Sequence, residues 1–393
     1  MSVAAKMQMF AEKSSWIRKM FEEGARMKTR HGAENVFDFS LGNPDVPPPA
    51  RFTEVLRELA ENDRPGAHAY MPNGGFPYVR ETLAHRLSVE QGVDLDQGEV
   101  LMTCGAAGAL NVIMKSLLDP GDEVLILSPY FVEYEFYIDN HGGSSRVVPT
   151  DEEFNLDFQA IEEALNPRTK AVLINSPNNP TGQIYPREDL QQLGRLLDRH
   201  GEQCCSTVYL VADEPYRKLV FDGHQVPSVM QATSNAIVAS SFSKDLSLPG
   251  ERIGYLAVHP EINQKNRLLD AMTLANRILG FVNAPALMQR VVEQLQEVTV
   301  DTGVYARRRE KFCTLLDEAG FEYVRPKGAF YLFPRSPIDD IVFCSILQEE
   351  KILAVPGRGF GAPGYFRLAF CVDDAVIERS AGAFQRAMAR ARE

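Results

Sequence analysis

The chain has 393 residues, of which 45% are hydrophobic and 24% are charged, so it can form a large domain with a smaller partner. Its formal net charge of -12 argues against a general nucleic-acid-binding surface. The six cysteines lack the paired spacing of a zinc site and are too sparse for a disulfide framework, which predicts reduced thiols in a cytoplasmic protein. We find no signal-peptide core and no run of about 18 apolar residues, so no membrane span is expected.

The N-terminal part contains a predicted helix and two loops. Ser14 to Arg30 carries an apolar face at helical spacing, for packing on its own domain or on a neighbouring subunit: Trp16, Ile17, Met20, Phe21 and Met27. Phe37 to Pro49 predicts a short strand and a Gly/Pro-rich loop, in which Gly42 lets a ligand approach the backbone closely; a plain linker explains it as well. Tyr70 opens a second such loop and could donate a hydrogen bond to a phosphate or simply pack.

Strands and helices alternate from about residue 100 to residue 260, which predicts a mainly parallel sheet covered by helices on both faces. The predicted strands lie near 100–105, 124–130, 142–148, 171–174, 208–212 and 236–239. Polar or small residues follow most of these strands, so we expect them to gather at one edge of the sheet, where open α/β sheets bind ligands.

Small residues stand where the first of these strands turns into a helix: Gly105, Ala106 and Ala107. They leave backbone N–H groups open at a helix N-terminus, which is typical of a phosphate cradle, although tight packing also favours small residues. Phe131, after the second strand, could stack on an aromatic ring or pack in the core. The turn NSPNNPTG, which contains Asn179, presents amide donors and acceptors.

Two ionisable residues come directly after buried strands, where an unpaired charge is costly. Asp213 follows one strand, with Tyr216 close behind; helix capping by Asp213 is the plainer alternative. Lys244 follows the next strand, within SSFSK, and a lysine amine at such a position suits a Schiff base with pyridoxal phosphate. Ser241 and Arg252 nearby provide the hydroxyl and guanidinium that bind a phosphate.

The C-terminal part predicts long helices at 263–279 and 285–316, the second breaking near Gly303, and then a separate α+β domain. Within it, Arg367 interrupts the apolar strand FRLAF. A buried arginine needs a carboxylate, which a substrate or an internal salt bridge could supply.

Together these motifs resemble the class I and II aminotransferases, the aspartate-aminotransferase-like enzymes of fold type I that use pyridoxal phosphate. The resemblance covers nearly the whole chain and rests on LGNPD, SPNNPTG, ADEPY, SFSK with a following arginine, and PKGAFYLFP, in the family's order. It implies an α/β fold with a large domain, whose mainly parallel seven-stranded sheet is sandwiched by helices, and a smaller α+β domain built from both termini. We expect the N-terminal arm and part of the small domain at 1–48, the large domain at 49–284 and the rest of the small domain at 285–393.

The resemblance also implies how the cofactor is held. Lys244 would form the Schiff base, and Asp213 would pair with the pyridine nitrogen. Tyr216 and Asn179 would bind the ring's 3-oxygen, and Phe131 would stack on the ring. The phosphate would be bound by a set at the sheet edge: Gly105, Ala106, Ala107, Ser241 and Arg252.

For the substrate, the resemblance implies that Gly42, Asn179 and Arg367 bind the α-carboxylate. Tyr70 would reach the phosphate of the other subunit of a homodimer. The expected reaction moves an amino group between an L-amino acid and a 2-oxo acid, with 2-oxoglutarate as acceptor, by a ping-pong mechanism without a metal. The peptide bonds expected to be cis precede two prolines, Pro129 and Pro180.

The chain departs from relatives at two positions. Glu251 stands where many have an aromatic residue, and Ala107 where some aspartate-using relatives have a lysine for the second carboxylate. Arg277 or Arg290 could replace that lysine or be a surface charge, so aspartate, aromatic, alanine and branched-chain donors stay open. A β-lyase or a cyclopropane-forming synthase would keep the same central residues. A DNA-binding regulator would need a longer N-terminal module, and a Rossmann dehydrogenase would need a G-x-G-x-x-G motif that this sequence lacks.

Overall fold

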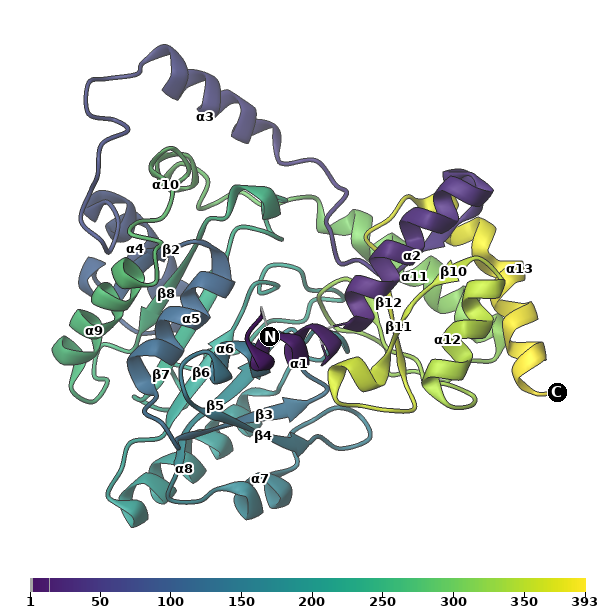
Figure 1. The fold of residues 1–393 in the computed structure, drawn as a ribbon. Helices are drawn as coiled ribbons and strands as arrows, with labels where there is room; N and C mark the ends of the chain where they lie inside the picture. The colour runs from purple at the N-terminus through teal and green to yellow at the C-terminus, as the bar shows by residue number, and fades with distance from the viewer. Residues whose placement is uncertain (1–2, 14) are drawn as a thin grey trace.

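The computed structural model describes residues 3–13 and 15–393, without the side chains of residues 12–22, and it has two unequal α/β parts (Figure 1). Most of the apolar face predicted for residues 14–30 lies outside the described side chains, namely Trp16, Ile17, Met20 and Phe21. Met27 of that face is buried and packs with Val36 and Leu353. The helix therefore contacts the smaller part of the molecule.

The large domain is built on a seven-stranded sheet with strand order β2-β8-β7-β6-β5-β3-β4. The pairs β7–β6, β6–β5, β5–β3 and β3–β4 are parallel, whereas β8 is antiparallel to both β2 and β7. The predicted mainly parallel seven-stranded sheet is thus confirmed. Its strands are β2 Val100–Thr103, β3 Glu123–Ser128, β4 Ser144–Pro149, β5 Thr169–Asn175, β6 Tyr209–Asp213, β7 Ala236–Ser241 and β8 Gly254–Val258.

Side chains alternate between the two faces of this sheet, as the period of a strand requires. In β7, Ala236 and Val238 belong to one apolar core, and Ile237 and Ala239 belong to the core on the other face. Strands buried on both faces explain why the sequence reads as short continuous apolar runs.

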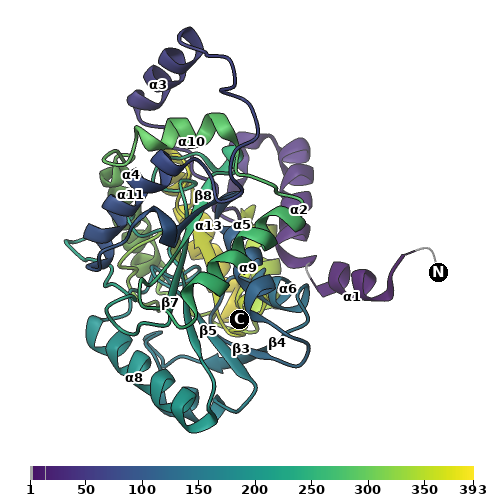
Figure 2. The ribbon, with the colours of Figure 1, turned by 90° about the vertical axis from the view of Figure 1, so that its left-hand side faces the viewer.

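Helices cover both faces of the sheet (Figures 1 and 2). Residues of three helices pack in the core on one face: α5 Gly105–Leu117, α6 Tyr134–Asp139 and α9 Lys265–Ile278. Residues of five helices pack on the other face: α3 Ala50–Glu61, α4 Pro77–Gln91, α7 Phe158–Ala164, α8 Arg187–Cys204 and α10 Ala286–Glu293.

The small domain combines both ends of the chain. Strand β1 Phe37–Asp38 pairs in parallel with β10 Ile352–Leu353. A three-stranded antiparallel sheet lies beside them, formed by β9 Tyr331–Leu332, β11 Val355–Pro356 and β12 Phe366–Ala369. The helices of this part are α2 Ser15–His31, α11 Thr302–Ala319, α12 Asp340–Glu349 and α13 Asp374–Ala391, and α1 Ala5–Lys13 precedes them.

The long helix predicted at 285–316 is in fact two helices, because the chain leaves α10 after Glu293 and α11 begins only at Thr302. Asp301 caps α11 by accepting a hydrogen bond from Gly303 N, so Gly303 lies in its first turn. Met288, Val291 and Leu295 pack in the large-domain core, whereas Val300 packs in the small-domain core. We therefore propose domain boundaries near 48 and 299 instead of 48 and 284.

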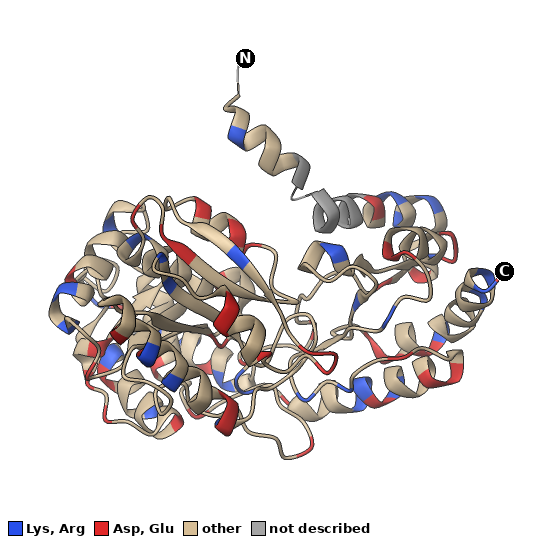
Figure 3. Cartoon of the chain, turned by 90° about the horizontal axis from the view of Figure 1, so that it is seen from below, with Lys and Arg blue, Asp and Glu red and all other residues tan. Residues whose placement is uncertain are grey.

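Acidic and basic residues are interspersed along the chain in both domains (Figure 3). In the part of the chain that the structure describes, no helix combines the length and apolar character needed to cross a membrane.

Candidate active site

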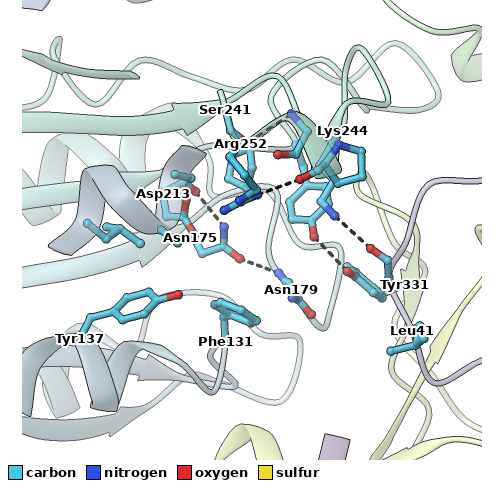
Figure 4. A pocket seen from close by; sticks show the side chains of 18 of the residues that line it. Leu41, Phe131, Tyr137, Asn175, Asn179, Asp213, Ser241, Lys244, Arg252 and Tyr331 are labelled. Atoms are coloured by element: carbon cyan, nitrogen blue, oxygen red, sulfur yellow. Dashed lines mark hydrogen bonds between the residues drawn. The ribbon is translucent and has the colours of Figure 1, made fainter. Parts of the chain in front are cut away.

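A cavity of about 310 Å³ lies between the two domains, beside the carboxyl ends of β5, β6 and β7 (Figure 4). This is the edge at which open α/β sheets bind ligands. Residues from both domains line it: Leu41, Gly42, Ala106, Ala107, Leu110, Phe131, Tyr137, Asn175, Asn179, Asp213, Pro215, Tyr216, Ser241, Ser243, Lys244, Pro249, Arg252, Tyr331 and Arg367.

Lys244 reaches this cavity from the turn after β7. Its Nζ donates a hydrogen bond to Gly42 O at 2.9 Å, and it lies 5.9 Å from the ring centre of Tyr216 and 5.4 Å from that of Phe330. Burial lowers the pKa of Lys244 from the usual 10.5 to about 8, so a large share of this amine is neutral in mildly alkaline solution. A neutral amine is what a nucleophile or a general base requires.

Asp213 is the last residue of β6 and is buried. Its Oδ2 accepts a hydrogen bond from Tyr134 Oη at 2.6 Å, whereas its Oδ1 is buried without a partner among the described residues. Burial is the main cause that raises the pKa of Asp213 from 3.8 to about 7; the Tyr134 hydrogen bond opposes it. A buried carboxylate with one free oxygen suits a cationic N–H donor from a ligand.

Two asparagines connect Asp213 to the substrate end of the cavity. Asn175 Nδ2 donates to Asp213 O at 2.8 Å, and Asn175 Oδ1 accepts from Asn179 N at 2.6 Å. Asn179 Oδ1 in turn accepts from Arg367 Nη1 at 3.1 Å. The turn that begins as NSPNNPTG thus fixes the spacing between the carboxylate and the arginine.

Arg367 comes from β12 and is 3% exposed. Its Nη2 donates to Ser40 O at 2.6 Å, and its guanidinium lies 4.7 Å from the ring centre of Tyr331 and 4.8 Å from that of Phe360. Its Nε is buried without a partner, and no carboxylate among the described residues pairs with this cation. A buried guanidinium without an anion is costly, so the site suits a ligand carboxylate.

An anion cradle lies at the N-terminus of α5. The N-cap residue, Cys104, makes no side-chain cap, so the first N–H groups of the helix are left for a ligand. Gly105 has a φ of 73°, and a Cβ there would lie 2.9 Å from Arg252 Nη2. Ser241 and Arg252 line the same side of the cavity, so glycine allows the guanidinium to reach the helix terminus.

Gly42 is needed where the small domain meets the cavity. A Cβ at this position would lie 1.8 Å from Tyr331 Oη, so any larger residue would displace the ring. Tyr331 Oη also shares a 2.9 Å hydrogen bond with Tyr216 Oη, and burial raises the pKa of both hydroxyls. Gly42, Tyr331 and Tyr216 are therefore packed as one unit next to Lys244.

Both chain segments that connect the domains hold the Lys244 turn. Asp245 O accepts hydrogen bonds from Val300 N at 2.8 Å and from Thr299 Oγ1 at 3.0 Å. On the N-terminal connection, Val46 O accepts from Ser247 Oγ at 2.5 Å. We call these contacts the inter-domain clasp.

The structure brings nearly all of the predicted site residues to this one cavity. The exceptions are Gly105, which lies at its rim next to Arg252, and Tyr70, which is 91% exposed and lines a separate surface hollow with Phe281 and Asn283. Neither Arg277 nor Arg290 lines the cavity.

The cis peptide expected before Pro129 is confirmed, but the one expected before Pro180 is wrong, because the second cis bond precedes Pro177. Pro180 instead lies inside a turn closed by the bond from Gly182 N to Asn178 O, at 2.9 Å.

Sequence reasoning missed several residues that complete the site: Tyr134, Tyr137, Asn175 and Tyr331. Asn175 and Tyr331 belong to the motifs NSPNNPTG and PKGAFYLFP, so those strings could have pointed to them. Tyr134 and Tyr137 lie one turn apart in α6, and their spacing resembles ordinary core packing.

The donor set fits pyridoxal phosphate. Lys244 offers an amine for its aldehyde, and Asp213 Oδ1 offers a free carboxylate oxygen for a protonated ring nitrogen. The open N-terminus of α5, with Ser241 and Arg252, offers N–H, O–H and guanidinium donors for its phosphate. Asp213 Oδ1 is buried without a partner within the described chain, as expected when a ligand supplies one.

Comparisons with known proteins agree with this geometry. The family model of aminotransferase class I and II matches residues 34–384. The aspartate aminotransferase of Thermotoga maritima is 33% identical over 378 residues, which cover 94% of this chain and 95% of that protein. The aspartate/prephenate aminotransferase of Thermus thermophilus is 32% identical over 372 residues, which cover 93% of this chain and 94% of that protein.

A crystal structure of an amino transferase from Eubacterium rectale has a TM-score of 0.97 and 37% identity, with 100% of both chains covered. The shared fold, the family match over most of the chain and the cavity chemistry lead to one conclusion. The chain belongs to the class I and II aminotransferases, the fold-type I transferases that depend on pyridoxal phosphate.

Proposed function

We propose that this enzyme moves an amino group from an L-amino acid to 2-oxoglutarate in two half-reactions of a ping-pong mechanism, with Lys244, Asp213 and Arg367 as its central residues. The observation that carries the proposal is the convergence of these three ionisable side chains on one cavity, where Asp213 Oδ1 and Arg367 Nε are buried without a partner in the described chain. An amine, an acid and a carboxylate-binding cation are the groups that amino transfer requires.

Arg367 binds and orients the substrate through its α-carboxylate. Its two terminal nitrogens are held by Asn179 and Ser40, so the guanidinium plane is fixed before the substrate arrives. Such preorganisation favours one orientation of the bound amino acid and aims its Cα hydrogen toward Lys244. Gly42 keeps this end of the cavity open to the carboxylate, because no side chain occupies the space next to Tyr331.

Lys244 acts as the base and then as the acid. Bound pyridoxal phosphate supplies the aldehyde that carries the amino group and the ring that withdraws electrons from the substrate. The amine of Lys244, with a pKa near 8, accepts the proton from the substrate Cα. It would then return this proton to C4′, the carbon of the cofactor's aldehyde group. Asp213 stays ionised opposite a cationic nitrogen, because a cation at Oδ1 offsets the burial that raises its pKa.

We also propose a homodimer whose subunits share their sites, with Tyr70 reaching the partner's phosphate. Tyr70 is 91% exposed in the single chain, and Leu274 and Ile278 of α9 are exposed apolar residues. An aromatic side chain held out from its own domain is expected when a second subunit covers it. We also propose that the enzyme is cytoplasmic, as expected from the sequence.

The donor is best identified by direct measurement. The described cavity contains three cations, Lys244, Arg252 and Arg367, and Ala107 stands where some aspartate-using relatives have a lysine. Aspartate, an aromatic amino acid, alanine and a branched-chain amino acid should each be mixed with the cofactor-loaded enzyme and followed by absorbance.

Conversion of the bound cofactor to its amine form by one donor, reversed by 2-oxoglutarate alone, supports the proposal. Release of ammonia without that conversion would instead indicate a β-lyase. A cofactor spectrum that no donor changes would refute amino transfer, and an unchanged rate in Lys244→Ala would refute the assigned role of the amine.

A further inference from the structure

The two segments that carry Asp213 and Lys244 each continue into a buried charge. Glu214 follows Asp213, and Asp245 follows Lys244, and both acidic side chains are buried. Glu214 lies just after the end of β6, and Asp245 lies in the turn after β7. Neither of them lines the cavity.

Asp245 and Lys218 connect the two segments to each other. Asp245 Oδ2 lies 3.9 Å from Lys218 Nζ, and Lys218 ends the turn that follows Asp213. Lys218 Nζ also donates to Gln296 O at 2.9 Å. Ser240 Oγ also donates to Glu214 O at 2.9 Å. The two segments are therefore joined by this hydrogen bond as well as by the contact between Asp245 and Lys218.

Other charged groups lie next to these contacts, on α4 and on the chain after Asp213. Arg86 Nε lies 3.3 Å from Glu90 Oε1 and its Nη2 donates to Tyr255 Oη at 2.9 Å. Arg217 Nη1 lies 2.9 Å from Glu214 Oε2. The charged groups that face Asp245 and Lys218 are therefore Arg86 and Glu90 of α4 and Glu297 of the chain after α10.

The Asp245–Lys218 pair is a poor source of stability. Asp245 Oδ1 is buried without a partner, and a 3.9 Å separation is long for an ion pair. Burying two charges with incomplete partners costs more free energy than an apolar pair of the same size. The pair thus needs an explanation other than the stability of the fold.

We propose that Asp245 and Lys218 are positioning residues for amino transfer: their side chains, which face each other at 3.9 Å, align the Lys244 turn with the Asp213 turn and keep the amine in its desolvated position. The proposal rests on the roles proposed above for Lys244 and Asp213. Asp245 O is also the acceptor of the inter-domain clasp, so side chain and backbone of one residue fix the turn from two directions.

The test compares Asp245→Asn with Glu99→Gln. Glu99 is a matched control, because it is a buried acid paired with a lysine, Lys265, at 2.8 Å, and it lies at the opposite edge of the sheet. In the cofactor-loaded enzyme we expect Asp245→Asn to lower kcat by about tenfold or more with little change in KM. Glu99→Gln should keep both constants close to the wild-type values.

A second readout does not depend on activity. Cyanate carbamylates only neutral amines, so the pH dependence of Lys244 carbamylation in the apoenzyme, measured by peptide mass spectrometry, reports the pKa of this amine. If Asp245 positions the turn, its loss admits water and raises the midpoint from about 8 toward 10.5, because burial is what lowers it. If Asp245 acted only through its charge, removing a negative charge would lower the midpoint.

An upward midpoint in Asp245→Asn, restored by Asp245→Glu, supports the proposal; an unchanged or lowered midpoint overturns it. Lys218→Met gives the same comparison if Asp245→Asn does not fold, and the double variant should be no worse than the poorer single one. Lys244→Ala in the kinetic assay tests the proposed role of the amine separately from the proposed role of Asp245. If Lys244→Ala is inactive but Asp245→Asn behaves like the wild type, only the positioning role is refuted.

Discussion

Replacing Asp213 by asparagine should make the apoenzyme more stable at alkaline pH. Asparagine has the same shape and keeps an oxygen for Tyr134 Oη, but it carries no charge to bury. The folded-state pKa of Asp213 is raised from 3.8 to about 7, mainly by burial. The folded chain therefore binds a proton more tightly than the unfolded chain, and this group costs stability as the pH rises from about 4 to about 7.

The size of the effect follows from the same numbers. The rise in the pKa of Asp213 from 3.8 to about 7 corresponds to a loss of at most about 4 kcal/mol in the free energy of unfolding. This loss is fully present above pH 7 and absent below about pH 4. We expect Asp213→Asn to gain a part of this, about 2 to 4 kcal/mol, in the free energy of unfolding at pH 8.

Urea unfolding of both apoenzymes at pH 4.5 and pH 8 measures the difference. Asp222→Asn is the control with the opposite sign, because the guanidinium of Arg309 lowers the pKa of Asp222 and its loss should destabilise the protein at pH 8. Adding pyridoxal phosphate should stabilise the wild type far more than Asp213→Asn. A stability difference between Asp213→Asn and wild type that is the same at both pH values would refute the reasoning.

Three further outcomes are expected. Lys244→Ala should still bind pyridoxal phosphate but lose at least about a hundredfold in amino transfer, and near-normal turnover would contradict the assigned base. Arg367→Lys should raise KM by about tenfold to a hundredfold with little change in cofactor affinity, because a single ammonium cannot keep the contacts to Asn179 and Ser40 while binding a carboxylate; an unchanged KM would count against it. Gly42→Ala should cost about 1 to 3 kcal/mol in unfolding free energy and raise KM, since its Cβ would lie 1.8 Å from the hydroxyl of the neighbouring tyrosine; equal stability would show that the ring moves freely.

The residues that sequence reasoning found are those whose chemistry conflicts with their surroundings. Lys244, Asp213 and Arg367 are ionisable groups in or beside apolar strands, so burial alone identified them as costly. The parallel sheet was predictable for a similar reason, because strands covered on both faces read as short apolar runs between helices.

The residues that were missed have side chains that are ordinary for the elements on which they lie. Tyr134 holds the carboxylate of Asp213, but an aromatic residue on a buried helix predicts packing just as well. The break between α10 and α11 was placed near Gly303, whereas Asp301 sets it through an N-cap that becomes visible only with the fold. The Asp245–Lys218 pair lies 27 residues apart in sequence, and only the pairing of β6 with β7 brings it together.

The inter-domain clasp limits how this enzyme can be re-engineered. Thr299 and Val300 on one connection and Val46 on the other bond directly to the turn that carries the reactive amine. A chimaera that takes its smaller domain from a relative would therefore exchange part of the support of Lys244 along with the substrate-binding arginine. Chimaeras joined outside residues 42–46 and 299–300 should keep the Lys244 amine in its position. Junctions inside these stretches should give a hybrid that folds but has a low turnover rate.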